Sequence, residues 1–387
     1  MAILSFVLVL STAHLAANFY NEPRLSSIVS FAAISIILTP FYIINFKQLE
    51  KKLDFKTISK INLSGTFLGM LAAIVGAYVG LGVYALILQA LMTTVVRLLF
   101  TLLVNKWTPS IYFNFSEIKE MVWYSLKFKA SDMAYYFERN VDYLILGKFF
   151  NSVTLGYYAF AYNIMYTPVK RISYVFSDVL FPSFSSFKDD KEKIMKGYFK
   201  SVQLIAMVSI PAMSIIAFNA EIVIQTVFGE KWNAAIPIVR ILCFAGAVQS
   251  ISQFGGVVFS SIRKPEIGLY ISIGKTILTV LAIVIGIQFG VLWVAYLLLL
   301  AKILSYLLFL IVLNKQISFS FMKLVGSLSS SIIILLTLSI IYTAAYMNLL
   351  NLNAWLLLGL MISISIALSY MFQKKLIMEM IRIIFKK

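Results

Sequence analysis

The sequence predicts an all-α, polytopic membrane protein with about twelve transmembrane helices. Of 387 residues, 61% are hydrophobic and only 13% are charged, whereas soluble domains carry about 25% charged residues. A helix needs about 20 mainly apolar residues to cross a bilayer, because no water satisfies the backbone there. Twelve such runs occur, at 2–19, 27–46, 61–79, 83–104, 125–149, 157–181, 202–219, 234–259, 267–288, 291–313, 324–346 and 354–373.

The basic residues are distributed unevenly between the predicted loops. With both ends of the chain inside, the inner segments hold 23 Lys and Arg, whereas the outer loops hold only Arg24, Lys148 and Lys231. This positive-inside pattern sets helix orientation, so we expect both termini in the cytoplasm. It also accounts for the net charge of +17 without a nucleic-acid partner, because no soluble basic module is present. The tail 374–387 is interpreted as an interfacial amphipathic helix.

An internal repeat organises the spans. When the chain is shifted by 209 residues, 60–78 falls on 269–287 and 97–106 falls on 306–315. The first unit then has four spans and the second has six, so the first lacks the equivalents of two leading helices. The predicted domains are an incomplete N-terminal lobe, a cytoplasmic linker with an interfacial helix, a C-terminal lobe, and an appended helix pair with a basic tail, at 1–104, 105–124, 125–313 and 314–387. Parallel repeats of this kind are typical of transporters.

Several stretches resemble one family of membrane proteins. They are NFYNEPRL (18–25), KKLDFK (51–56), KWTPSIYFNFSEIKE (106–120), RNVDYLILGKFFNSVTLGYYAFAYN (139–163), VLFPSFSSF (179–187) and FGEKWNAAIPIV (228–239). With these stretches the chain resembles the Wzx-type polysaccharide or O-antigen flippases, in the colanic-acid-exporter branch of the multidrug/oligosaccharidyl-lipid/polysaccharide exporter superfamily. Members typically have fourteen helices, so this chain resembles one that begins at the third helix.

The resemblance implies a two-lobed bundle that works by alternating access in the bacterial inner membrane. Its implied substrate is an oligosaccharide repeat unit on undecaprenyl pyrophosphate, used to make O-antigen, capsule or exopolysaccharide. Implied partners are membrane lipids, a polysaccharide polymerase and chain-length proteins; no cofactor or metal is expected. Two alternatives stay open: a drug or cation exporter of the same superfamily, and a membrane polymerase or ligase. Such polymerases and ligases place their catalytic groups in a large outer loop. The enzyme is therefore disfavoured, because the longest predicted outer loop here, 220–233, is short and holds no histidine.

Charged residues within the predicted spans are the candidate site. Arg139, Lys170, Arg171 and Lys302 lie near mid-membrane, where an ionisable group normally faces a cavity or a partner. We expect these cations to share a cavity and hold the pyrophosphate, since charge-assisted bonds to phosphate oxygens are strong. Glu138 and Asp142 are candidates for coupling to a proton or another cation.

Two other interpretations of span charges stay open. Glu138, Arg139 and Asp142 are spaced to pair on one helix, which would give a self-neutralised cluster with a structural role only. Three further cations nearer to the span ends are expected to extend toward the membrane surface: Arg97, Arg240 and Lys275.

Tyrosines recur at every fourth position of the span 157–181. Tyr158, Tyr162 and Tyr166 head a row that continues through Lys170 and slants around the helix, because four residues advance by 400°. In a wet cavity, tyrosine rings stack on sugars and their hydroxyls form hydrogen bonds; packed between helices they are ordinary core. The cavity interpretation makes these three tyrosines substrate-binding candidates.

Overall fold

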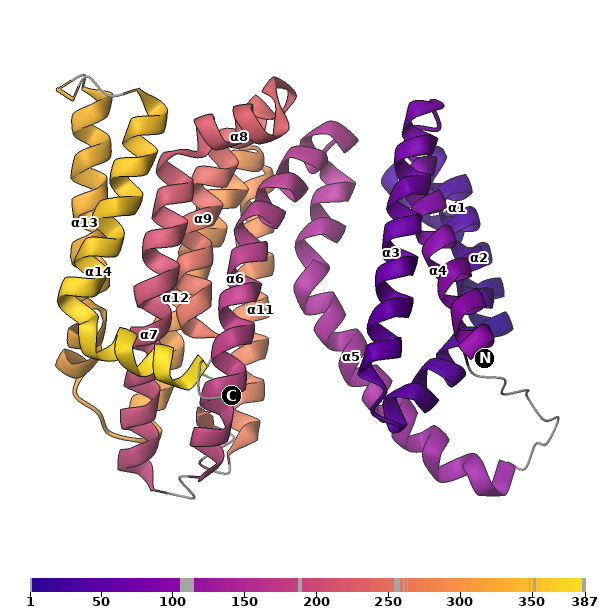
Figure 1. Ribbon diagram of the computed structural model, residues 1–387, viewed down its shortest axis with the longest axis horizontal. Coiled ribbons are helices and arrows are strands. Elements are labelled where there is room, and N and C mark those ends of the chain that lie inside the picture. The colour runs from indigo at the N-terminus through magenta and orange to yellow at the C-terminus, as the bar shows by residue number, and fades with distance from the viewer. Residues whose placement is uncertain are drawn as a thin grey trace. The chain divides into compact units, whose positions relative to one another are not determined.

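The computed structural model is entirely helical over the residues it describes (Figure 1). These are 2–104, 115–186, 190–253, 258, 259, 262, 264–347, 349, 350 and 353–384; for some helical residues, including Glu138, Arg139 and 172–186, only the backbone is described. The helices are α1 Ala2–Tyr20, α2 Arg24–Lys51, α3 Phe55–Tyr78, α4 Tyr84–Val104, α5 Phe115–Phe149, α6 Ser152–Ser186, α7 Lys191–Phe218, α8 Ala220–Phe228, the 3-10 helix η1 Glu230–Ala235, α9 Ile236–Ser252, α11 Pro265–Ile287, α12 Val291–Gln316, α13 Phe321–Tyr346 and α14 Ala354–Ile384.

Ten segments in the described part of the chain are long and apolar enough to cross a membrane. They match ten of the twelve predicted spans. The other two, predicted at 125–149 and 157–181, fall within α5 and α6, which are helices of 35 residues each but are not among the ten. The prediction of an all-helical protein with many membrane spans is confirmed, with ten such segments in the described part of the chain. α5 and α6 carry several of the predicted site residues, among them Asp142 and Lys170.

The chain forms two compact units, Met1–Ala130 and Ser131–Lys387. In the first unit, α1 packs on α2, α2 on α4, and α3 on α4. In the second, α7 packs on α9, α9 on α12, and α11 on α12. The packing of α3 on α4 resembles that of α11 on α12, the helices that contain the stretches paired by the sequence repeat.

The core of the second unit lies around α7 and α9. In the most apolar 18 residues of each segment, 61% are buried in α7 and 67% in the segment that contains α9, but only 22% in α11. The reason is that α6 packs on both helices, α12 covers α9, and α13 and α14 pack on α7. Large apolar side chains such as Met165, Leu242 and Phe309 fill the space between them. The charged and polar groups of this unit are therefore held by a well-packed frame.

A close approach between α11 and α12 fixes the geometry of that helix pair. Gly290 has φ of 106°, which only glycine adopts without strain, so the chain reverses sharply between the two helices. A Cβ on Gly286 would lie 2.7 Å from the Cα and 2.9 Å from the N of Val294. Backbone atoms cannot move aside cheaply, so glycine at position 286 lets the two helices meet.

We expect Gly286→Ala to destabilise the protein by about 1–3 kcal/mol, the usual cost of overpacking a closed contact. Thermal unfolding of the purified protein in detergent measures the effect. Gly326→Ala on α13 is the matched control, because a Cβ there meets nothing within 4 Å. A helical Gly→Ala change in open space is neutral or favourable. Equal stability of the two variants would contradict the close approach.

Candidate functional site

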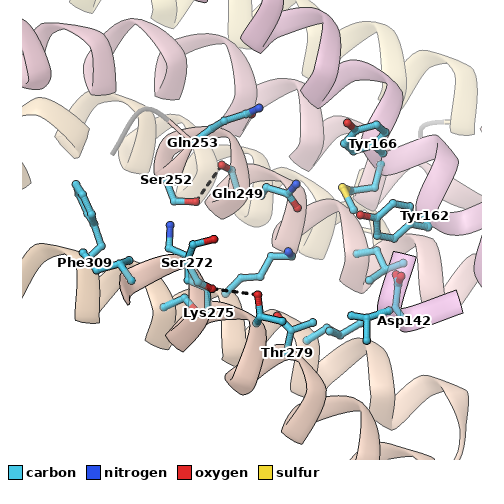
Figure 2. Close-up of a pocket in the computed structure, with 18 of the residues that line it drawn as sticks. Asp142, Tyr162, Tyr166, Gln249, Ser252, Gln253, Ser272, Lys275, Thr279 and Phe309 are labelled. Atoms are coloured by element: carbon cyan, nitrogen blue, oxygen red, sulfur yellow. Dashed lines mark hydrogen bonds between the residues drawn. The ribbon is translucent and has the colours of Figure 1, made fainter. Parts of the chain in front are cut away.

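A polar pocket of about 480 Å³ lies inside the second unit. Its walls come from the last third of α5, the middle of α6, the end of α9, and the helices α11 and α12 (Figure 2). Its size falls within the range of about 300–1,000 Å³ typical of ligand pockets. Of the site residues predicted from the sequence, the pocket brings together Asp142, Tyr162, Tyr166 and Lys302.

One face of α11 supplies a stripe of polar side chains. Ser272, Lys275, Thr276 and Thr279 all line the pocket, and their spacing of three, four and seven residues places them on one side of a helix. On the neighbouring helix α12, Lys302, Ser305 and Phe309 also line it. Hydroxyl and amine groups on two otherwise apolar helices thus converge on one space.

Lys275 sits near the midpoint of α11, half-buried, with its amine 5.8 Å from the centre of the Phe309 ring. The expectation that Lys275 extends toward the membrane surface is therefore wrong. The distance of Lys275 from the end of the span suggested the membrane surface. The sequence does hold a sign of the pocket, because Ser272, Thr276 and Thr279 lie on the same face of the helix as Lys275.

Among the described residues that line this pocket, Asp142 is the only one with a carboxylate, and it is 5% exposed. One carboxylate oxygen accepts a hydrogen bond from the Tyr158 hydroxyl at 2.9 Å, and the other accepts one from the backbone N–H of Tyr143 at 2.9 Å. The positive charge of Lys302 also acts on it. These contacts fix the carboxylate in place at the edge of the pocket.

The row of tyrosines on α6 divides into two roles. Tyr162 and Tyr166 line the pocket and stack with their ring centres 5.8 Å apart. Tyr158, by contrast, is fully buried and directs its hydroxyl to Asp142, so the interpretation of Tyr158 as a group facing the cavity is corrected. The row slants around the helix, and the first tyrosine therefore points into the packed interior while the next two face the pocket.

Amide side chains from α9 complete the wall. Gln249, Ser252 and Gln253 line the pocket, and Figure 2 shows them on the side away from Thr279. The side-chain oxygen of Gln249 is buried and has no hydrogen-bond partner among the described residues. A buried acceptor normally finds a donor, so the pocket offers a hydrogen-bonding position to a ligand or a water molecule.

Of the other predicted cations, the two whose side chains the structure describes do not line this pocket. Lys170 and Arg171 lie on α6 beyond Tyr166, are exposed, and are not part of the pocket lining. The expectation that they share one cavity with Lys302 is therefore not met by this pocket. Glu138 and Arg139 belong to α5, but their side chains lie outside the described residues, so their roles stay predictions.

Arg97 and Arg240 were expected to extend toward the membrane surface. Both are half-buried, and the Nε atom of each is buried without a hydrogen-bond partner among the described residues. Arg240 also pairs with Glu221 of α8 at 3.3 Å, and the Arg97 side chain lies against Gly65 of α3. Each guanidinium is thus held in part by the helix next to its own.

Comparison with known proteins gives one consistent picture. A family model described as "Polysaccharide biosynthesis protein" matches residues 1–237. The lipopolysaccharide biosynthesis protein WzxC of Escherichia coli is 26% identical over 82% of this chain and 65% of its own length. The teichuronic acid biosynthesis protein TuaB of Bacillus subtilis is 27% identical over 74% of this chain and 60% of its own length.

The same architecture occurs in a solved structure. The lipid II flippase MurJ, in an inward closed conformation, superposes with a TM-score of 0.74, covering 98% of this chain and 82% of that one at 14% sequence identity. This likeness shows the exporter fold. The chain spans less than two thirds of the length of the two curated relatives named above. Because the family model matches more than half of the chain, the protein belongs to the polysaccharide biosynthesis family of Wzx-like, multi-pass membrane transport proteins.

Proposed function

We propose that this protein moves an oligosaccharide linked to undecaprenyl pyrophosphate across the bacterial cell membrane by alternating access, in the synthesis of a surface polysaccharide. The observation that carries the proposal is the pocket in the second unit, where amines, hydroxyls, amides and stacked tyrosines converge inside a bundle of membrane helices. Two relatives of the protein are named for the synthesis of lipopolysaccharide and teichuronic acid, which supports a saccharide as the transported substrate.

The chemistry of the pocket suits the two ends of such a substrate. Among the described residues of the lining, Lys275 and Lys302 bring two amines against one carboxylate, that of Asp142. This balance favours an anion, and amines bind phosphate oxygens strongly. The faces of Tyr162 and Tyr166 and the unpartnered oxygen of Gln249 suit a sugar ring and its hydroxyls. We assign the pyrophosphate to the lysines and the first sugar to the tyrosines.

The main alternative is an exporter of cationic drugs. A cation would need an excess of carboxylate in the pocket, because a like charge beside a desolvated cation is unfavourable. The excess of amine over carboxylate in the lining favours the anionic substrate. Arg139, Lys170, Arg171 and Glu138 remain predicted contributors to substrate binding and ion coupling elsewhere along α5 and α6.

Direct binding tests the proposal. The purified chain in detergent should bind an undecaprenyl-pyrophosphate-linked oligosaccharide more tightly than undecaprenyl phosphate, which lacks the sugar and one phosphate. Native mass spectrometry or a fluorescence titration measures both. Preference for a lipophilic cation over the lipid-linked saccharide would overturn the proposal in favour of a drug exporter.

We also propose that both termini lie in the cytoplasm, on the basis of the asymmetry of basic residues. A Lys193→Cys variant should resist a membrane-impermeant maleimide in intact cells and react after permeabilisation, whereas a Lys231→Cys variant should react in both. Both positions are exposed, and the native Cys243 is buried, so background labelling stays low. Labelling of the Lys193→Cys variant from outside would reverse the topology.

A further inference from the structure

A second hollow lies at one end of the second unit, separate from the polar pocket. It is a groove of about 490 Å³ between the first turns of α7 and the connection from α12 to α13. None of its lining residues belongs to the pocket described above. We call it the α7–α13 groove; it is lined by Lys191, Glu192, Met195, Lys196, Phe199, Gln316, Ile317, Ser318, Phe319, Ser320 and Lys323.

The groove has a charged rim. Lys191, Lys196 and Lys323 are all exposed, as is Glu192. The carboxylate of Glu192 pairs with the Lys196 amine at 2.6 Å and lies close enough to Lys323 for their charges to interact. Three amines thus surround one carboxylate, and the rim has an excess of positive charge.

The floor of the groove is apolar. Met195 and Ile317 are buried, and the rings of Phe199 and Phe319 meet edge to face with their centres 5.7 Å apart. Just beyond the groove, Phe321 and Met322 at the start of α13 are 57% and 79% exposed. An apolar surface therefore continues from the charged rim along the outside of a membrane-crossing helix.

The length of the helices places the groove at the membrane surface. α7 has 28 residues, which is about 42 Å at 1.5 Å per residue, whereas the hydrocarbon core of a bilayer is about 30 Å thick. α7 is therefore longer than the hydrocarbon is thick, and its first turns, where Lys191, Glu192 and Lys196 are exposed, are the part that suits the headgroup layer. Asp190 caps that end by accepting hydrogen bonds from Lys193, and these bonds hold the pKa of Asp190 below its usual value.

We propose that the α7–α13 groove binds an anionic phospholipid, with the phosphate at the lysines and the upper part of an acyl chain on the apolar floor and the exposed start of α13. Neither amines alone nor an apolar floor alone would select such a ligand. Their combination at headgroup depth fits a negatively charged headgroup joined to hydrocarbon, because each lysine near the surface attracts anionic lipid. The inference stands independently of the transported substrate.

Lipid binding by the purified full chain tests the proposal. In nanodiscs or by native mass spectrometry, the protein should retain phosphatidylglycerol in preference to phosphatidylcholine. Replacing Lys191, Lys196 and Lys323 together with Gln should weaken the retention of phosphatidylglycerol at least tenfold, since each lysine contributes roughly fivefold. A second triple variant, with Gln at Lys52, Lys56 and Lys60, is the matched control, because these lysines are also exposed but lie outside the groove. Its retention should fall clearly less than that of the groove variant, because the groove adds an apolar floor beside its lysines.

A variant that is expected to strengthen lipid binding distinguishes the proposal from a loss of binding caused by misfolding. Glu192→Gln removes the one carboxylate of the rim and should tighten phosphatidylglycerol binding a few-fold. Inorganic phosphate alone should neither stabilise the protein nor displace the lipid. The proposal is overturned if the groove variant retains lipid like the wild type, if Glu192→Gln weakens retention, if free phosphate competes, or if an acidic peptide binds the groove in preference to phosphatidylglycerol.

Discussion

Replacing Lys302 with Gln should weaken binding of the pyrophosphate-linked saccharide by about 10–100-fold. A hydrogen bond to a charged group contributes about 1.5–3 kcal/mol, and each 1.4 kcal/mol is a factor of ten in affinity. Lys302 lines the pocket near the midpoint of α12. We expect a bound phosphate to be poorly hydrated at that depth, so water would not replace the interaction that the lysine provides. A titration of the purified variant with the lipid-linked saccharide measures the effect.

The matched control is on the same helix. Lys315→Gln makes the same chemical change in the last turn of α12, at an exposed side chain outside the pocket, and should bind the saccharide like the wild type. Lys275→Gln should resemble Lys302→Gln, because its amine lines the same space. If both pocket variants bound with unchanged affinity, the assignment of the pyrophosphate to this pocket would have to be abandoned.

Replacing Asp142 with Asn should separate binding from transport. The change keeps the shape of the side chain but removes the one negative charge among the described residues of the pocket lining, so the two lysines attract an anion more strongly. We expect binding of the pyrophosphate-linked saccharide to tighten several-fold. Transport in reconstituted vesicles or in a complementation strain should fall at least tenfold, because the amide of Asn, unlike a carboxylate, exchanges no proton and cannot couple substrate release to an ion gradient.

A second variant distinguishes this role from a structural one. Tyr158→Phe removes the hydroxyl that donates to Asp142 and leaves the charge in place, at an expected cost of about 1 kcal/mol in stability. It should lower thermal stability with little tightening of substrate binding. If Asp142→Asn lowered stability and weakened binding in parallel, Asp142 would be a packing group and the coupling role would be wrong.

The sequence by itself determined the class of protein and the path of its backbone. Hydrophobic runs report helices that must satisfy their own hydrogen bonds in lipid. Ten of the twelve predicted runs match helices in the described part of the chain that are long and apolar enough to cross a membrane, and the other two fall within the long helices α5 and α6. The charges in α5 and α6 were also visible in the sequence.

Only the tertiary structure decided which charges meet. Lys275 and Lys302 come from two packed helices, α11 and α12, whose adjoining ends meet in the tight approach of Gly286 to Val294, a contact that helical periodicity does not encode. Tyr158 and Tyr162 have the same spacing pattern in the sequence, yet one is sealed against Asp142 and the other lines the pocket. Depth along a span follows from counting residues, but the direction of a side chain around the helix axis acquires meaning only once the neighbouring helices are in place.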